Sequence, residues 1–481
     1  MKKIITAAIL LCFMALLAGC VYDENHITYS RTNAENQPFE SSIPLDLAAS
    51  LFAQAQEAWD NDDGYLWGFN MFAPSMIADP ITRHVAANMP DDYGHFTRYG
   101  DVYVGILPDD VFVSHTTANF AGLTWGMLMW SPDIAHVFET EQFELFGGYE
   151  VIKTGLLQVL IHEGFHALQF DKVVSGEPNP LSSQVMPHLN ECAESRISVL
   201  LEINALWAAL RSEGDEQLQA IHDAMSIRAH RREGRPVVYL SENLQEIVEG
   251  LAVFSEYVLF RDVEALFAQY HYRYWVDSLK ESSGMGFTFP YFTGAVYAWF
   301  LRQAGTDWQQ GITFETDLAA LLQEALGFEA LTPFYDIDLE RYGYSHIAPG
   351  QREWVENFQR IQQGAEEFLT QRNISIEGLW TFGGIFDVYL VNVPDEATGW
   401  AHTVNYGHMD FVTANWRLEV FSGFMHTAHF PTMAIVVPFF DNIEISQGGR
   451  RAIAPAWTLD ITDDNYKIIK TDNGEIEIVR R

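Results

Sequence analysis

Two histidines four residues apart lie inside an otherwise apolar run. His162-Glu163-Gly164-Phe165-His166 follows the apolar stretch Leu156–Ile161, and the spacing of this segment is that of a helix. On a helix, residues i and i+4 lie on the same face. A buried helix with three ionisable groups needs partners for them, because an unpaired polar group in a core costs free energy. The fold must therefore surround this helix with elements that supply those partners.

The composition is that of a large folded protein. The chain has 481 residues, of which 48% are hydrophobic and 19% charged, so a mostly disordered chain is excluded and two or three domains are expected. Its 65 acidic residues against 28 Lys and Arg give a net charge of −37. Because no basic stripe interrupts this charge, binding to a nucleic acid or to an anionic membrane face is disfavoured.

The N-terminus predicts an export signal and a lipid anchor. Lys2 and Lys3 precede a short apolar segment that ends in Leu17-Ala18-Gly19-Cys20, which resembles a bacterial lipobox. We expect residues 1–19 to be removed, Cys20 to be acylated and residues 20–45 to form a polar tether. Val21, rather than an aspartate, follows the cysteine and favours the outer membrane in a diderm cell. The alternative is an ordinary signal peptide, and no later run has the length of a membrane span.

The pattern along the rest of the chain predicts an α+β fold. Short strands are expected between 65 and 130, and a mixed domain over 46–375 is followed by a small β domain over 376–481, in which Asn473-Gly474 marks a hairpin. Helices are predicted at Leu47–Trp59, Gly155–Phe170, Glu191–Ser212, Glu242–Phe260, Tyr291–Ala304, Asp317–Leu326 and Arg352–Arg372.

Several polar groups outside the histidine pair receive simple structural interpretations. Cys192 is expected to be a lone thiol rather than a metal ligand, because Cys12 lies in the signal and Cys20 carries lipid. Residues 60–64 are expected to form a solvated turn rather than a calcium loop. A second metal site is disfavoured at His402, His408, His426 and His429, and a solvated helix end, or a grip for a substrate carboxylate, is expected at Arg228, His230, Arg231 and Arg232.

The histidine pair predicts a zinc site. Two imidazoles on one helix face can bind one Zn²⁺ ion, and Glu163 beside the first can reach a water held there. Chance produces this pattern in only about 0.04 cases per chain of such composition. For the third ligand we prefer Glu249, which lies in an amphipathic helix and precedes a glycine that permits close helix packing. Glu191 and Glu194 are the rivals, and Glu246 is expected to support a ligand rather than to be one.

Four segments together resemble a known group of proteins. His-Glu-Gly-Phe-His-Ala-Leu-Gln at 162–169, a Leu-Leu-Glu…Ala-Leu helix at 200–210, Glu-Gly-Leu-Ala at 249–252 and Tyr291…Gly-Ala-Val-Tyr297 are similar to poorly characterised bacterial HExxH proteins of the gluzincin type. The resemblance covers about residues 50–305. It implies a zincin-like domain with two His and one Glu on zinc. The chain departs from the group where Val253 and Phe254 follow, so support for a metal-bound histidine would come from Glu256 or Glu246.

The roles implied by this resemblance define an expected function. Glu163 would be the general base, and Tyr291 or Tyr297 the donor to the oxyanion, with Tyr291 preferred because Pro290 places it at a helix start. We expect an envelope-anchored zinc metallopeptidase that acts on peptides or proteins. The alternatives are a non-catalytic surface lipoprotein that binds peptide or glycan on a zincin scaffold, and a zinc hydrolase of a non-peptide amide.

Overall fold

The computed structural model divides the chain into two compact units. One spans Ala8–Lys280 and Met285–Pro349, and the other consists mainly of Gly350–Arg481. The structure describes residues 41–108, 111–131, 134, 137–138, 148–179, 188–260, 279–280 and 285–370, and from 373 to 480 the strands and some of their connections. The predicted signal peptide, Cys20 and nearly all of the tether lie outside these residues. No helix in the described part is long and apolar enough to cross a membrane.

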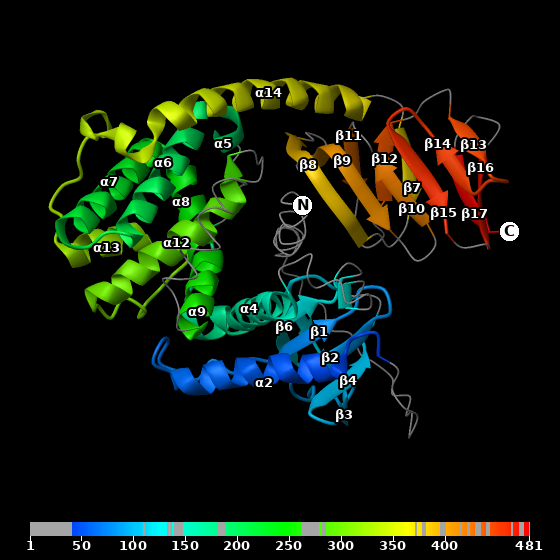
Figure 1. The fold of residues 1–481 in the computed structure, drawn as a ribbon, viewed down its shortest axis with the longest axis horizontal. Helices are drawn as coiled ribbons and strands as arrows, with labels where there is room; N and C mark the ends of the chain where they lie inside the picture. The colour runs from blue at the N-terminus through cyan, green and yellow to red at the C-terminus, as the bar shows by residue number, and fades with distance from the viewer. Residues whose placement is uncertain are drawn as a thin grey trace. The chain divides into compact units, whose positions relative to one another are not determined.

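The first unit begins with a mixed six-stranded sheet. Its strand order is β3-β4-β2-β1-β6-β5, in which only β1 and β6 run parallel (Figure 1). The strands predicted between 65 and 130 are thus confirmed. Their bounds are β1 Ser75–Ala78, β2 His84–Ala87, β3 Thr97–Tyr99, β4 Val102–Ile106, β5 Thr116–Phe120 and β6 Leu123–Met129.

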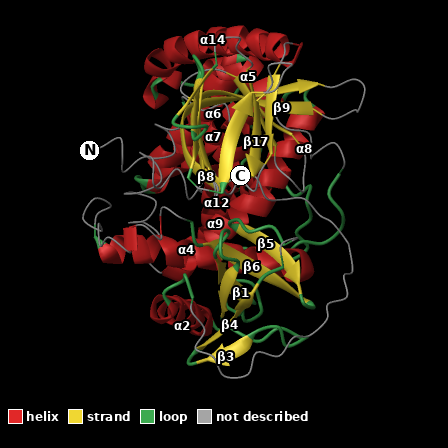
Figure 2. Cartoon of the chain, turned by 90° about the vertical axis from the view of Figure 1, so that its right-hand side faces the viewer, coloured by secondary structure: helices red, strands yellow, loops and turns green. Residues whose placement is uncertain are grey.

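Both faces of this sheet are buried, because its side chains alternate. Ile77 and Leu128 join the large core that includes helices α2 (Leu45–Asp62) and α4 (Tyr149–Leu168), whereas Met76 and Met127 join a second cluster on the opposite face. Figures 1 and 2 show α2 and α4 lying alongside the sheet. The helix that carries the histidines therefore packs directly on a rigid sheet.

Helices form the remainder of the first unit. They confirm the predicted positions with shifted ends: α2 continues into the acidic turn, and Asp317 caps α13. Helix α7 was not predicted, and the predicted helix Glu242–Phe260 covers only the end of α8. The bounds are η3 Gln169–Val173, α5 His188–Glu191, α6 Ala193–Leu210, α7 Gly214–Arg232, α8 Pro236–Gln245, η4 Glu246–Gly250, α9 Leu251–Phe260, α12 Met285–Ala304, α13 Leu318–Leu326, η6 Phe334–Asp336 and η7 Leu339–Tyr342. Helix α14 follows over Tyr344–Thr370.

The expected solvated helix end at Arg228, Arg231 and Arg232 is wrong. All three arginines are buried, and each is ion-paired inside the helical layer. Arg231 lies 2.6 Å from Glu202 and 2.8 Å from Glu242, and Arg232 lies 2.6 Å from Glu242. Acids from other helices thus take the place of water around these arginines. The sequence of α7 alone does not reveal such partners.

The second unit is a sheet domain, as expected for the C-terminal part. Its nine-stranded sheet has the order β13-β14-β15-β10-β9-β11-β12-β7, with β8 paired to β9. The predicted hairpin is confirmed, since β16 and β17 pair in antiparallel fashion. The bounds are β7 Asn373–Glu377, β8 Thr381–Pro394, β9 Ala401–Val412, β10 Trp416–Val420, β11 Phe424–Ala428, β12 Ala434–Pro438, β13 Glu444–Ser446, β14 Arg451–Ile453, β15 Trp457–Ile461, β16 Tyr466–Lys470 and β17 Ile476–Arg480. The side chains of His402, His408, His426 and His429 lie outside the described part.

Helix α4 approaches β6 most closely at one glycine. A Cβ atom added to Gly126 would lie 2.4 Å from the carbonyl oxygen of Glu163. Because the obstacle is backbone, no side-chain rotation can relieve the clash. Gly126 therefore sets the distance between the sheet and the histidine-bearing turn.

We predict that Gly126→Ala destabilises the protein by about 1–3 kcal/mol, because it forces α4 away from β6. Gly155→Ala is the matched control, since Gly155 lies in α4 and its added Cβ meets nothing within 4 Å. The control should be neutral or stabilise the helix by up to about 1 kcal/mol. Chemical denaturation of both variants tests this, and equal stabilities would contradict the assigned role of Gly126.

Candidate metal centre

Three side chains from two distant segments converge in the interior of the first unit. His162 and His166 project from α4, and Glu249 projects from η4; all three are buried. The two Nε2 atoms are 3.1 Å apart, and Oε2 of Glu249 lies 3.4 Å from Nε2 of His162 and 3.3 Å from Nε2 of His166. This buried His-His-Glu group could bind a metal ion.

The distances fit a single small cation. Three atoms bound tetrahedrally at about 2.0–2.1 Å from one ion lie about 3.3–3.4 Å from one another. Among the described residues, Oε2 of Glu249 is buried without a hydrogen-bond partner, although it faces both nitrogens. A buried carboxylate oxygen left in this way normally has a compensating positive charge. The donor set and its spacing therefore fit a metal.

The segment that carries Glu249 is a π-helical turn held against α12. Gly250 permits this contact, because its added Cβ would lie 2.7 Å from Cα of Gly294. The glycine after Glu249 was expected to allow close packing on the histidine-bearing helix, but Gly250 lies against α12 instead. Single π-helical turns inside longer helices frequently occur at functional sites.

Each histidine also has a partner on its other ring nitrogen. Nδ1 of His162 lies 3.4 Å from Oε2 of Glu256, and Nδ1 of His166 lies 2.9 Å from Oε1 of Gln169. Such contacts orient metal-binding imidazoles and keep the proton on Nδ1. The structure thus places Glu256 where a support for His162 was expected.

The acids of the site control the protonation of His162. Burial alone would lower the pKa of His162, but Glu249, Glu256 and Glu163 outweigh this effect and raise the pKa to about 10. Burial would likewise raise the pKa of Glu249, but the two histidines hold it well below its usual range. In the metal-free chain, His162 is therefore a cation between carboxylates.

Glu163 lies beside this group in a different state. Burial raises the pKa of Glu163 to about 7, although His162 and His166 oppose the rise. Its Oε1 is buried and has no hydrogen-bond partner in the described part of the chain. Glu163 can therefore exchange a proton near neutral pH.

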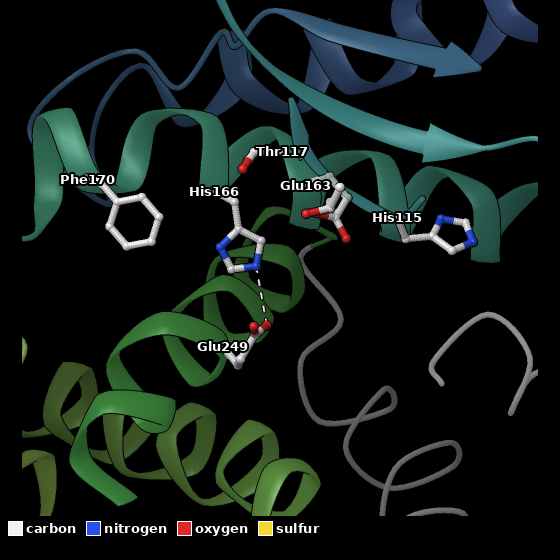
Figure 3. Close-up of a pocket in the computed structure, with 7 residues that line it drawn as sticks. His115, Thr117, Glu163, His166, Phe170 and Glu249 are labelled. Atoms are coloured by element: carbon white, nitrogen blue, oxygen red, sulfur yellow. Dashed lines mark ion pairs between the residues drawn. The ribbon is translucent and has the colours of Figure 1, made fainter. Parts of the chain in front are cut away.

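A small pocket opens onto the site from the sheet edge. Figure 3 shows Thr117, Glu163, His166 and Glu249 around it, and the full lining is His115, Thr116, Thr117, Glu163, His166, Phe170 and Glu249. His115 precedes β5, and burial, together with the charge of His162, lowers its pKa to about 4. The pocket thus combines proton-exchanging groups with the backbone of an edge strand.

The structure does not bring every expected residue to this site. Tyr291 lies beside His162, with parallel rings whose centroids are 6.2 Å apart, but it is within α12, so the helix start expected after Pro290 is wrong. Tyr297 instead donates to Glu202 at 2.8 Å. Glu246 binds Arg228 and accepts from Thr293, so it contacts neither histidine. The rivals Glu191 and Glu194 are exposed.

Five residues of the site were not identified from sequence. His115, Thr116, Thr117 and Phe170 line the pocket, and Gln169 bonds to His166. Gln169 and Phe170 lie three and four residues after His166, one helical turn on, so their proximity was a usable signal. The contribution of β5 depends on strand order, for which the local sequence carries no signal.

Comparisons of the chain with protein-family models, with curated proteins and with solved structures found no match. The chemistry of the site therefore has to be argued from its own residues.

We predict that Glu249→Gln weakens the binding of Co²⁺ or Zn²⁺ at least about tenfold, because an amide oxygen is a poorer ligand than a carboxylate. Glu191→Gln and Glu194→Gln are the matched controls and should bind as the wild type does. Titration followed by the visible absorption of Co²⁺ gives the affinities. If Glu191→Gln or Glu194→Gln lost the metal and Glu249→Gln kept it, the ligand set would be wrong.

We also predict that metal affinity rises with pH. The ion must replace a proton on His162, whose pKa is about 10, so between pH 6 and 8 the affinity should increase about tenfold per pH unit. Glu256→Gln removes one carboxylate that raises this pKa, so it should make the dependence shallower at the upper end. Competition with a chelator of known pH dependence measures this. An affinity that did not change with pH would show that His162 is not protonated in the free protein.

Proposed function

We propose that this chain is an envelope-anchored zinc-dependent metallopeptidase with a zincin-like fold. One observation carries the proposal: two imidazole nitrogens and one carboxylate oxygen lie 3.1–3.4 Å from one another, and a buried glutamate stands next to them. Catalytic zinc sites use three protein ligands of this kind and leave one position open. When bound, zinc would polarise a substrate carbonyl and lower the pKa of a water molecule.

Glu163 supplies the proton transfer that peptide hydrolysis requires. With its pKa raised to about 7, its carboxylate can accept a proton from the attacking water and pass it to the leaving amine. Gly126 lets the backbone of Glu163 pack against β6, and this fixes the position from which the Glu163 side chain extends. A group that is positioned in this way loses little entropy in the reaction.

Among the described strands, β5 lies at one edge of the six-stranded sheet, and this supports a peptide as the substrate. Gly126 donates its N–H to the carbonyl of Pro74, on the β1 side of β6, and Thr117 pairs with Gly126 across the sheet. Because the N–H of Gly126 points toward β1, Gly126 and Thr117 form a pair that exchanges no hydrogen bonds. The N–H and C=O groups of Thr117 therefore point away from β6, toward the sheet edge. An extended peptide can add to an edge by these groups. This favours a peptide over a small amide.

Two residues are candidates to stabilise the oxyanion. Tyr291 lies beside His162, and His115 lines the pocket. Nδ1 of His115 accepts from N–H of Met129 at 3.3 Å, so the proton of this neutral imidazole is on Nε2. Both side chains can donate one hydrogen bond. Tyr297 is less suited, because its hydroxyl is committed to Glu202.

The alternative is a non-catalytic lipoprotein that binds peptide or glycan. A binding protein has no chemical need for Glu163, and a buried carboxylate without a hydrogen-bond partner costs free energy. Retention of this residue in an intact site favours the enzyme. The anchor at Cys20 and the envelope location are expected from the lipobox-like sequence and belong to the same proposal.

We predict that Glu163→Gln keeps metal affinity within about threefold and lowers peptide hydrolysis by about 10²–10⁴-fold, because the amide cannot accept the proton. A mixed peptide library read by mass spectrometry measures hydrolysis. Glu177→Gln changes an exposed glutamate and should keep full activity. Undiminished hydrolysis by Glu163→Gln would remove it as the base, and a wild type that binds metal without turnover would favour the binding protein.

We predict that Thr117→Pro lowers kcat/KM for peptides by about tenfold and leaves metal affinity unchanged, because proline removes the outward N–H. Asn119→Pro is the matched control: Asn119 pairs with Thr124, faces the same edge and does not line the pocket. It should affect kcat/KM by less than about threefold. Equal effects of the two variants would mean that substrate does not pair beside Thr117.

A further inference from the structure

Gln169 occupies a junction between the two segments of the metal centre. It is the first residue of η3, directly after α4 and three residues beyond His166, and it is fully buried. A buried primary amide must place both of its N–H groups and its oxygen against partners. The partners of Gln169 therefore define its orientation.

Two backbone carbonyls fix this orientation. Nε2 of Gln169 donates to the carbonyl of Ile247 at 2.7 Å and to that of Val248 at 2.9 Å. Because carbonyl oxygens only accept, the amide nitrogen must be on this side and Oε1 must face His166. Nδ1 of His166 then donates to Oε1, at 2.9 Å, and its Nε2 keeps a lone pair directed at Glu249 and the metal position.

We infer that Gln169 is a positioning residue that couples the second histidine to the segment carrying Glu249. The Oε1 arm of its amide accepts from His166 and sets the tautomer of this histidine. The Nε2 arm holds the backbone immediately before Glu249. This inference rests only on the metal-binding part of the proposed function. It assigns to one side chain the alignment of ligands 83 positions apart in the chain, 166 and 249.

The π-helical geometry of η4 explains why the bonds from Nε2 of Gln169 matter. A π-helical turn is wider than an α-helical one and is rarely stable without support. Gln169 donates to two consecutive carbonyls of this turn, and loss of these bonds would remove the side-chain support that holds this backbone in place. Glu249, the next residue, would then lose its fixed direction.

Two variants separate the arms. Gln169→Leu removes both, and Gln169→Glu keeps an oxygen for His166 but sets a carboxylate against two carbonyls. If Gln169 only oriented His166, Gln169→Glu should bind Co²⁺ as tightly as the wild type or more tightly, since a carboxylate partner makes a ligating imidazole more basic. Coupling predicts instead that both variants lose about 10–100-fold in Co²⁺ affinity.

Two further readouts distinguish positioning from general destabilisation. Amide hydrogen exchange at residues 246–251 should become faster in both variants, and the ¹H–¹⁵N signal of His166 Nδ1–H should be lost in Gln169→Leu. Gln217→Leu is the matched control, because Nε2 of Gln217 also donates to two carbonyls, those of Ala209 and Ser212, and joins α7 to α6 without a histidine. It should leave Co²⁺ affinity unchanged.

The outcomes are separable from those that test hydrolysis. Wild-type affinity in Gln169→Glu would overturn the coupling, and equal losses in Gln169→Leu and Gln217→Leu would reduce it to a stability effect and overturn it as well. Failure of the wild type to bind Co²⁺ would overturn both the coupling and the metal site. Loss of peptide hydrolysis alone, with the Co²⁺ results as expected, would leave the coupling intact and remove only the peptidase proposal.

Discussion

The interior of the first unit holds charges that must compensate one another. Glu246 and Glu249 belong to the same π-helical turn but face two different clusters: Glu246 binds Arg228, and Glu249 faces the two histidines. In a medium of low dielectric constant, each carboxylate requires its own positive partner. The arginine cluster on α7 supplies the first, and the two histidines, which could also hold a metal ion, face the second. The position of η4 is thus fixed by charge on both sides.

Close backbone packing makes this arrangement rigid. Gly126 brings α4 onto β6, and Gly250 with Gly294 brings η4 onto α12. Protein interiors are close-packed, so a segment cannot shift without a large cost in free energy. The three candidate ligands therefore sit on elements whose positions are defined by packing contacts, as precise sites require.

The sequence predicted what is local and missed what depends on distant partners. The helix of His162 and His166 and the helix that begins at Asp317 follow from apolar spacing alone. Helix α7 was not predicted, because its arginines are buried in ion pairs with acids of other helices. The edge position of β5 and the second contact of Gln169, 78 residues away at Ile247, arise only when the chain has folded. Tyr297 was predicted at the site for the same reason: its hydroxyl donates to Glu202, a contact that arises only in the folded chain.

The metal centre also has a topological meaning for this chain. Of three cysteines, Cys192 is free, and the other two lie in the N-terminal segment. An ion bound by His162, His166 and Glu249 would link α4 to η4 across about 80 residues of chain. Because its ligands come together only in the folded chain, it would stabilise the fold through its binding free energy and not by restricting the unfolded chain. Unlike a disulfide, such a link would form only after both segments have reached their places, so it would favour the correct fold without fixing a wrong pairing.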